Sequence, residues 1–277
     1  MNVFRKGIAA VTLLLYALPA FSQILGDNEE TSKFGYSRYF VFGAGATYRS
    51  FIDQSLSSRK YEKAGPTAAI ANIRLNENKY TELWIQGSYV NAETPNGPFA
   101  PARIKMYNGL IDYRHLYKID FLNEMIYDVR VGGLLSAQYA HKNAPHLEYS
   151  GKVDDYAMSI GLSGKIAREI MFDDLPGYIM LDVSMPLFSS SSRPPYLNKV
   201  TALETEKNSD NGFFANNSIG LFGKFLRLNT RIHFLYPLKR TTNKLRFTYQ
   251  WDYFKIKGAS AVYSAEHTLM LTFMFNY

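Results

Sequence analysis

An alternation of apolar and charged residues runs through many segments of the chain, and it restricts the fold more than any other feature. Successive side chains of a β-strand point to opposite faces of the sheet, so each segment would carry its charges on one face and its large apolar residues on the other. A Lys or Arg that faced lipid at mid-bilayer would cost about 2–4 kcal/mol. The separation therefore predicts a polar interior and an apolar exterior. The charged residues of the interior face are Arg49, Arg74, Glu82, Asp112, Arg114, Asp128, Arg130, Lys165, Asp182, Arg227, Arg231, Arg246 and Asp252.

The last segment shows the same alternation. Its large apolar positions are Leu269, Leu271, Phe273, Phe275 and Tyr277. A strand that continues to an aromatic last residue is unusual in a soluble domain, where chain ends tend to fray. The segment resembles the last strand of Gram-negative outer-membrane β-barrels, which typically ends in an aromatic residue. The resemblance rests on pattern, without a family-specific motif, and it implies that barrel-assembly machinery recognises this strand.

The first residues have the layout of a secretory signal peptide. Arg5 and Lys6 form a positive region, 8–18 is apolar, and Ala20-Phe21-Ser22 has the small-x-small pattern of a cleavage site. The apolar run is too short to cross a bilayer as a helix. We therefore interpret residues 1–22 as a cleaved export signal, which predicts an outer-membrane location for the mature chain.

The rest of the sequence divides into a polar, acidic segment at 23–37 and an alternating region at 38–277. We interpret the first as a flexible periplasmic lead-in. No run in the second is long and apolar enough for a membrane helix, and a backbone that crosses lipid must be a helix or a closed barrel. The expected fold class is therefore all-β, with a single antiparallel transmembrane β-barrel.

Turn residues divide the barrel region into about ten strands, in which short connections alternate with longer polar ones. The strands are expected near 38–51, 67–76, 80–92, 103–118, 125–141, 152–168, 177–189, 217–237, 243–256 and 265–277. The longer connections are expected at 52–66, 93–102, 142–151, 190–216 and 257–264. Segment 217–237 is too long for one spanning strand of roughly 9–11 residues, so about twelve strands is the alternative count.

Composition favours a membrane barrel over a soluble β-sandwich, which would also alternate. The chain has 21 Tyr and 19 Phe, as expected when aromatic side chains lie at both membrane interfaces. It has no Cys, which excludes disulfides and thiolate chemistry. The net charge of +7 is spread along the chain without a basic helix or a base-stacking motif, so nucleic acid is not expected as a partner. No metal-spaced His cluster or phosphate loop is present, so we predict no metal and no cofactor.

The barrel size bears on what the lumen can do. A barrel of about eight strands has an interior that side chains just fill, and open channels appear at about 16–18 strands. A barrel of about ten strands is therefore expected to hold a charged lumen filled by paired side chains, in a structural or envelope-associated protein. The alternative is a narrow channel for small polar or anionic solutes, because basic residues outnumber acidic ones on the interior face.

A hydrolase at the outer rim is the second alternative. Omptin-type proteases are barrels with Asp pairs and a His–Asp couple at the rim, and Asp154, Asp155, His141 and His146 fall near one rim here. Neighbouring residues on a strand point to opposite faces, so the two carboxylates are not expected to share the lumen. Ser218 lies in a partial match to a phospholipase-type motif that lacks its His. We therefore predict no catalytic residue and no enzymatic activity.

The loops suggest contacts outside the barrel. Arg59, Lys60 and Lys63, with Lys255 and Lys257, could meet lipopolysaccharide phosphates as a general anchor in the outer leaflet. The expected partners are thus outer-membrane lipid and lipopolysaccharide, together with the assembly machinery. A loop as long as 190–216 is usually functional or disordered, and it is the expected contact site for a surface or envelope protein.

Deleting Phe275–Tyr277 should lower the amount of assembled barrel in the membrane, because this stretch would close the sheet and present the aromatic end. Quantitative immunoblotting of isolated outer membranes would measure the loss. Membrane levels equal to those of the full chain would contradict the role assigned to this strand.

Overall fold

The computed structural model describes residues 37–95, 101–119, 127–145, 152–172, 175–192, 217–221, 225–238, 242–257 and 261–277. The chain forms two compact units, Met1–Gly35 and Tyr36–Tyr277, and all described residues belong to the second. The assignment of 1–22 as a signal peptide, and most of the lead-in at 23–37, lie outside the described residues.

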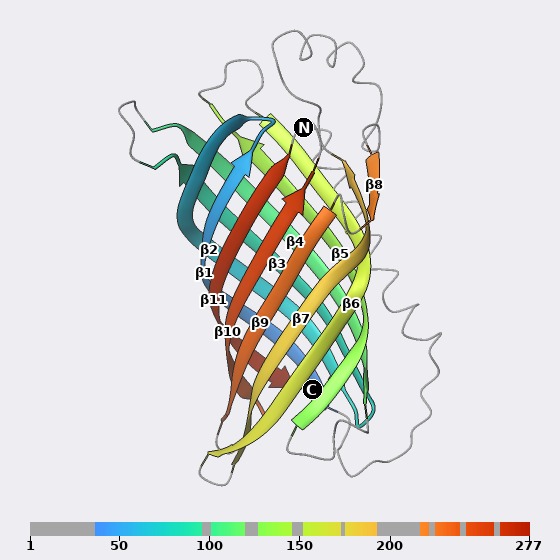
Figure 1. Cartoon of the computed structure of the whole chain (residues 1–277). Coiled ribbons are helices and arrows are strands. Elements are labelled where there is room, and N and C mark those ends of the chain that lie inside the picture. Colours follow the sequence, from blue (N-terminus) through green and yellow to red (C-terminus); the bar gives the residue numbers. More distant parts are fainter. Residues whose placement is uncertain are drawn as a thin grey trace. The chain divides into compact units, whose positions relative to one another are not determined.

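Every regular element in the described ranges is a β-strand (Figure 1). The strands are β1 (Ser37–Asp53), β2 (Ser57–Leu75), β3 (Lys79–Glu93), β4 (Arg103–Lys118), β5 (Tyr127–Asn143), β6 (Lys152–Phe172), β7 (Leu175–Ser192), β8 (Asn217–Leu221), β9 (Phe225–Pro237), β10 (Lys244–Ile256) and β11 (Val262–Asn276). In the part of the chain that the structure describes, no helix is long and apolar enough to cross a membrane.

The strands form one closed antiparallel barrel. Each strand pairs with its sequence neighbour from β1 to β7, and β9 pairs with both β7 and β10. β11 pairs with β10 and with β1, which joins the last strand to the first. β8 and β9 both pair with β7, at Phe188–Ser192 and Tyr178–Ser184 respectively. These two pieces occupy a single place in the barrel, so the all-β prediction of about ten strands is confirmed and the alternative of twelve is wrong.

At one end of the barrel, β1, β2 and β11 extend beyond the strand limits predicted from the sequence. The predicted connection at 52–66 is mostly strand, because β1 continues to Asp53 and β2 begins at Ser57 after a turn at 54–56. The charged residues near the start of β2 make this segment look like a loop in the sequence. Tyr61 in the same segment is nevertheless fully buried and lies opposite Phe51 in the sheet. The predicted connection at 257–264 is also wrong in part, since β11 begins at Val262. Of the predicted long loop at 190–216, residues 190–192 belong to β7, so the loop begins later than predicted, and 193–216 lie outside the described residues.

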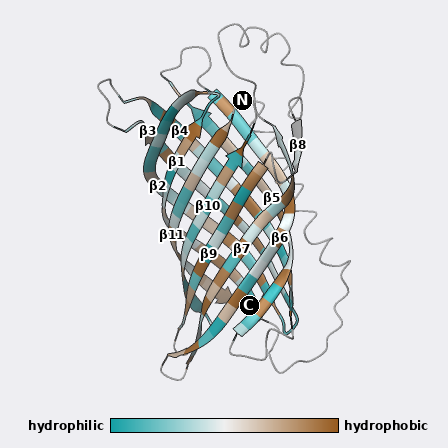
Figure 2. Cartoon of the chain, viewed as in Figure 1, coloured by the Kyte–Doolittle hydropathy of each residue, from teal (hydrophilic) through white to brown (hydrophobic). Residues whose placement is uncertain are grey.

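The two faces of the barrel differ in polarity as predicted. Along each strand in Figure 2, hydrophilic and hydrophobic residues alternate. The exposed large residues of the outer face are apolar or aromatic, and they include Phe42, Leu135, Ile160, Ile232 and Leu269. Such a surface is stable against lipid and would be unfavourable in water. The outer face therefore fits the hydrocarbon layer of a membrane.

The β1–β11 seam brings the two ends of the barrel region together. The strands pair without interruption from Tyr39 opposite Asn276 to Asp53 opposite Val262. On the outer face Phe42 stacks on Phe275, with ring centroids 5.4 Å apart. The backbone N–H of Tyr277 donates to the Arg38 carbonyl at 3.1 Å. Leu269, Leu271, Phe273, Phe275 and Tyr277 thus lie on the outward face of the strand that closes the sheet.

Two glycines of β1 let the seam form. Gly43 and Gly45 face inward, and a Cβ on Gly45 would overlap the Leu269 backbone, while one on Gly43 would overlap the Thr272 side chain. A side chain at either position would therefore push β11 away from β1. The close approach of the two backbones explains why the sequence has Gly-Ala-Gly inside this strand.

Gly45→Val should prevent most of the protein from closing its barrel, because the overlap with β11 costs at least about 1–3 kcal/mol at the seam. Gly87→Val is the matched control, since a Cβ on the outward-facing Gly87 has nothing within 4 Å. The folded fraction after refolding into lipid vesicles can be measured as the faster-migrating species in unheated gels. Equal folded fractions for the two variants would show that the seam tolerates a side chain.

Candidate functional site

The barrel interior is the candidate site, because it holds the buried charges. The end that carries the short connections and the C-terminus is called the periplasmic end, as in outer-membrane barrels, and the other is called the outer end. The structure places all but one of the predicted interior charges on the inward face. These are Arg49, Glu82, Asp112, Arg114, Asp128, Arg130, Lys165, Asp182, Arg227, Arg231, Arg246 and Asp252.

Arg74 is the exception, and its predicted lumen position is wrong. Its neighbour Ile73 is buried in the interior, so Arg74 shares the outward face with the exposed Ile70. The inward residues of β2 at this end are Ala69, Ala71 and Ile73, which are apolar. The charge of Arg74 therefore indicated the wrong face of β2, because the interior is apolar at the periplasmic end.

Ion pairs cross the middle of the lumen. Arg114 on β4 donates to Asp182 on β7 at 3.0 Å, although these two strands are not neighbours in the sheet. Arg231 on β9 donates to Asp112 on β4 at 2.7 Å. All four side chains are at most 1 % exposed. The contacts connect opposite walls, so side chains occupy the central section of the barrel.

Each central charge has several partners. Asp182 also lies 2.8 Å from the Lys165 ammonium and 3.3 Å from His233, and Arg227 lies 2.5 Å from Asp252. Burying a charge costs several kcal/mol unless opposite charges and hydrogen bonds replace its hydration. The network replaces most of this hydration by sharing each carboxylate among two or more cations or hydrogen-bond donors, while both Nη atoms of Arg246 have no hydrogen-bond partner. Glu82 lies 3.5 Å from Arg114 and 3.6 Å from Arg246. We define the central ion network as Glu82, Asp112, Arg114, Lys165, Asp182, Arg227, Arg231, Arg246 and Asp252.

Trp84 lies at the edge of the central ion network. The guanidinium carbons of Arg231 and Arg246 are 4.8 and 5.0 Å from the centroid of its ring. Trp84 is fully buried, and its Nε1 donates to Gln86 at 3.1 Å. The indole therefore stabilises two cations through its π face.

An apolar cluster fills the periplasmic end below this network. The sequence did not predict it, because the inward residues there are small or appear among polar ones. Met270 and Met274, for example, alternate with the large apolar residues of the last strand and are both buried inside. The members of this periplasmic cluster are Tyr39, Val41, Ala69, Ala71, Ile73, Tyr80, Trp84, Leu116, Leu235, Met270 and Met274.

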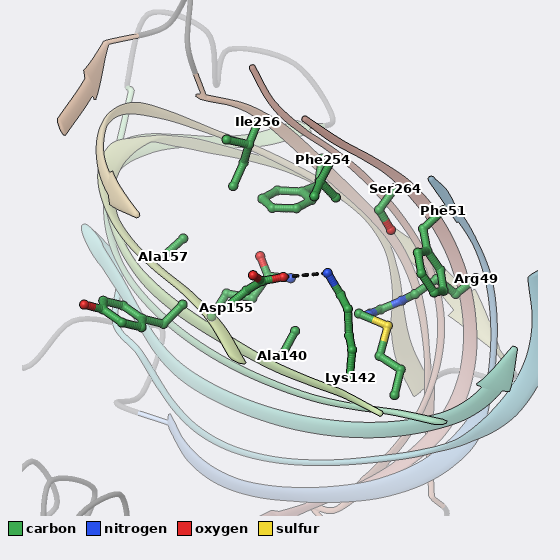
Figure 3. Close-up of a pocket in the computed structure, with 13 residues that line it drawn as sticks. Arg49, Phe51, Ala140, Lys142, Asp155, Ala157, Phe254, Ile256 and Ser264 are labelled. Atoms are coloured by element: carbon green, nitrogen blue, oxygen red, sulfur yellow. Dashed lines mark hydrogen bonds and ion pairs between the residues drawn. The ribbon is translucent and has the colours of Figure 1, made fainter. Parts of the chain in front are cut away.

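A cavity lies at the outer end of the lumen (Figure 3). Its apolar lining includes Phe51, Met106, Ala140, Ala157, Phe254 and Ile256. The volume that the centre of a water molecule can reach inside this cavity is about 30 Å³. One water needs about 10–15 Å³ of such volume, so the cavity is larger than a single water site. We call this cavity the outer cup.

A lysine and two carboxylates lie beside the outer cup. The Lys142 ammonium is 2.5 Å from Asp155 and also contacts Asp53. Figure 3 shows the Lys142–Asp155 pair inside the cup. The sequence interpretation missed Lys142 and Asp53 as lumen residues, because both fell in or at the edge of predicted loops. Recognising the extension of β1 and β5, from the alternation Phe51–Asp53 and Ala140–Lys142, could have found them.

The candidate catalytic residues of the rim are separated as their positions on one strand require. Asp154 faces outward, where its carboxylate is 2.7 Å from His141 Nδ1 and accepts a hydrogen bond from the Tyr139 hydroxyl at 2.7 Å. Asp155 faces inward to Lys142. The two carboxylates therefore do not form a pair. His146 lies outside the described residues, and within those residues no group of three His, Cys, Asp or Glu side chains could hold a metal ion.

Comparison with known proteins supports the fold. No family model matches the sequence, and no curated protein matches it. The outer-membrane protease OmpT from Escherichia coli superimposes with a TM-score of 0.51 and 9 % identity, covering 90 % of this chain and 99 % of OmpT. The translocator domain of the autotransporter NalP from Neisseria meningitidis has a TM-score of 0.39 and 10 % identity, covering 98 % of each chain. Neisserial surface protein A has a TM-score of 0.34 and 12 % identity, covering 84 % of this chain and 95 % of the other.

The closed barrel and its apolar outer face are the fold of an outer-membrane β-barrel, and the similarity to OmpT supports that fold. The location of the chain is accordingly the outer membrane. At an identity of 9 %, the similarity to OmpT shows the fold alone.

Asp182→Asn should lower the free energy of unfolding by about 3–5 kcal/mol, because Lys165 and Arg114 would then be buried with too little opposite charge. Asp154→Asn is the matched control: its pair with His141 is exposed, and surface pairs contribute about 0–1 kcal/mol. Urea unfolding in lipid vesicles, followed by Trp fluorescence, measures both. A loss under about 1 kcal/mol for Asp182→Asn would mean that the central ion network does not stabilise the barrel.

Proposed function

We propose that the protein is a structural or envelope-associated outer-membrane barrel whose lumen is closed to solutes. The observation that supports this most directly is the pairing of opposite walls, Arg114 with Asp182 and Arg231 with Asp112. A solute on its way through would have to separate these pairs. Each separation would leave buried charges without partners, at a cost of several kcal/mol.

The order of layers along the lumen supports the same proposal. The outer end contains an apolar cluster that includes Phe51, Tyr61 and Ile104, the middle contains the central ion network, and the periplasmic end contains the periplasmic cluster. A hydrated ion would lose its water at both apolar layers. Hydrophobic constrictions of this kind are one means by which pores are closed.

The charge balance favours a closed lumen over an anion passage. Arg74 leaves the interior set, while Lys142 joins it together with Asp53, Asp155 and Glu266. Each of the eight buried cations in the described ranges then has a carboxylate oxygen within 3.6 Å. The cations are Arg49, Arg114, Arg130, Lys142, Lys165, Arg227, Arg231 and Arg246. The excess of positive charge that suggested a passage for anions is thus compensated.

We propose that the protein is not an enzyme. Among the described rim candidates, the Asp154–His141 pair faces away from the lumen, and Asp155 in the outer cup is bound to Lys142 and not to a histidine. A general base must lie within hydrogen-bond reach of a bound substrate, which the outward position does not favour.

We also propose that lipid is the principal partner. Lys60 and Lys63 lie at the outer end of β2, paired with Glu62 at 2.6 Å and Glu93 at 2.9 Å. With Arg59, Lys255 and Lys257 they could exchange these partners for lipopolysaccharide phosphates, which are stronger acceptors. A protein partner for the loop at 190–216, and the assembly machinery for the last strand, remain part of the proposal.

Planar-bilayer recordings test the closed lumen. Purified protein should insert without discrete, reproducible conductance steps across a range of voltages. The double variant Asp112→Ala with Arg231→Ala removes one cross-lumen pair without changing the net charge, and it should produce discrete steps. Folding of both proteins is checked by gel migration, and regular steps from the unaltered protein would overturn the proposal in favour of a narrow channel.

A further inference from the structure

The outer end of the lumen contains two adjacent spaces that differ in polarity. Above lies the outer cup with its apolar walls, and below it lies a smaller polar space, which we call the polar chamber. Gln86, Gln250, Asp252 and Glu266 line the chamber. The cup and the chamber share residues, among them Arg49 and Gln138. From its mouth inward, the lumen is therefore first mainly apolar, with the Lys142–Asp155 pair in its wall, and then polar.

The boundary between the two spaces holds a donor and an acceptor without partners. Arg49 is 2 % exposed, and its Nε has no hydrogen-bond partner although its Nη2 binds Glu266. The Oε1 atom of Gln138 is also buried without a partner. An unsatisfied buried polar atom costs about 1–3 kcal/mol, so a group that both accepts and donates a hydrogen bond would be stabilised here.

The charge and size of the chamber restrict that group. The two guanidinium groups at the chamber are each paired with a carboxylate, Arg49 with Glu266 and Arg227 with Asp252. An ionic head would therefore find no opposite charge left for it. The space for the centre of a water-sized molecule is about 10 Å³, which is room for about one water. The head must be neutral and little larger than a water molecule.

We propose that this end of the lumen binds a slim neutral amphiphile, with a hydroxyl head in the polar chamber and an apolar tail in the outer cup. The hydroxyl oxygen accepts from Arg49 Nε, and the hydroxyl proton is donated to Gln138 Oε1. The first two or three carbons of the tail, roughly what the cup can hold, pack against Phe51, Met106 and Phe254, and the rest of the tail extends through the mouth of the cup. The central ion network lies below, so the ligand binds from outside and does not pass through. The site goes beyond the proposed structural role and does not depend on whether the lumen conducts.

Methyl NMR of the full barrel in lipid nanodiscs tests this site with 1-hexanol as the probe. The Met106 methyl group lines the cup, whereas Met158 is exposed on the lipid-facing surface. The Met106 shift should saturate with hexanol, and the Met158 shift should rise linearly as the alcohol partitions into lipid. Hexanoate and hexylammonium should need at least about tenfold higher concentrations for the same Met106 shift.

Three variants separate the cup from general effects. Ala157→Trp fills the cup and should abolish saturation at Met106, whereas Ala68→Trp places the same ring on the outward face and should preserve it. Gln138→Leu keeps the cup and removes the acceptor, and it should weaken hexanol binding about tenfold. A linear Met106 response in the unaltered protein, equal saturation in Ala157→Trp, or tighter binding of hexanoate would each overturn the proposal.

Discussion

Every backbone polar group that lies in lipid must find its partner within the protein, and the rest of this structure depends on that requirement. A sheet meets it only when its first and last strands join. Here β1 and β11 pair over their whole common length, and the two inward glycines of β1 allow the backbones to come close. Closure then creates an interior, and the size of that interior decides what kinds of side chain can fill it.

The interior is narrow enough for side chains from opposite walls to meet. Arginine reaches across it, because the guanidinium lies at the end of a long side chain and can bind more than one carboxylate. Arg114 contacts both Asp182 and the Asn229 side chain. Apolar residues above and below exclude water from these pairs, which strengthens them. The charges that mark the strands as amphipathic in the sequence thus become the packing of the core.

Much of this could be predicted from the sequence, since alternation is a local property. The strand order, the closing strand and the inward position of Arg49, Asp112 or Arg231 follow from period two and chain order. Arg74 shows where the method fails: its strand is apolar inside, so a single charge indicated the wrong face. Lys142 and Asp53 were missed because strands that extend beyond the membrane are rich in polar residues and look like loops. Which cation pairs with which carboxylate depends on the curvature of the closed sheet, so these pairings cannot be predicted from a local sequence pattern.

The seam between β1 and β11 also limits the order in which the protein can fold. Thr47 and Thr268 share a hydrogen bond over 221 positions of sequence, and Arg49 binds Glu266 over 217. Loop-closure entropy must be overcome before such distant contacts contribute, so topologies of this kind fold slowly. Folding strand by strand from the N-terminus would leave β1 with one unpaired edge, and Arg49 without its carboxylate, until β11 is delivered. The chain must therefore be kept from aggregating during export until its last strand is available.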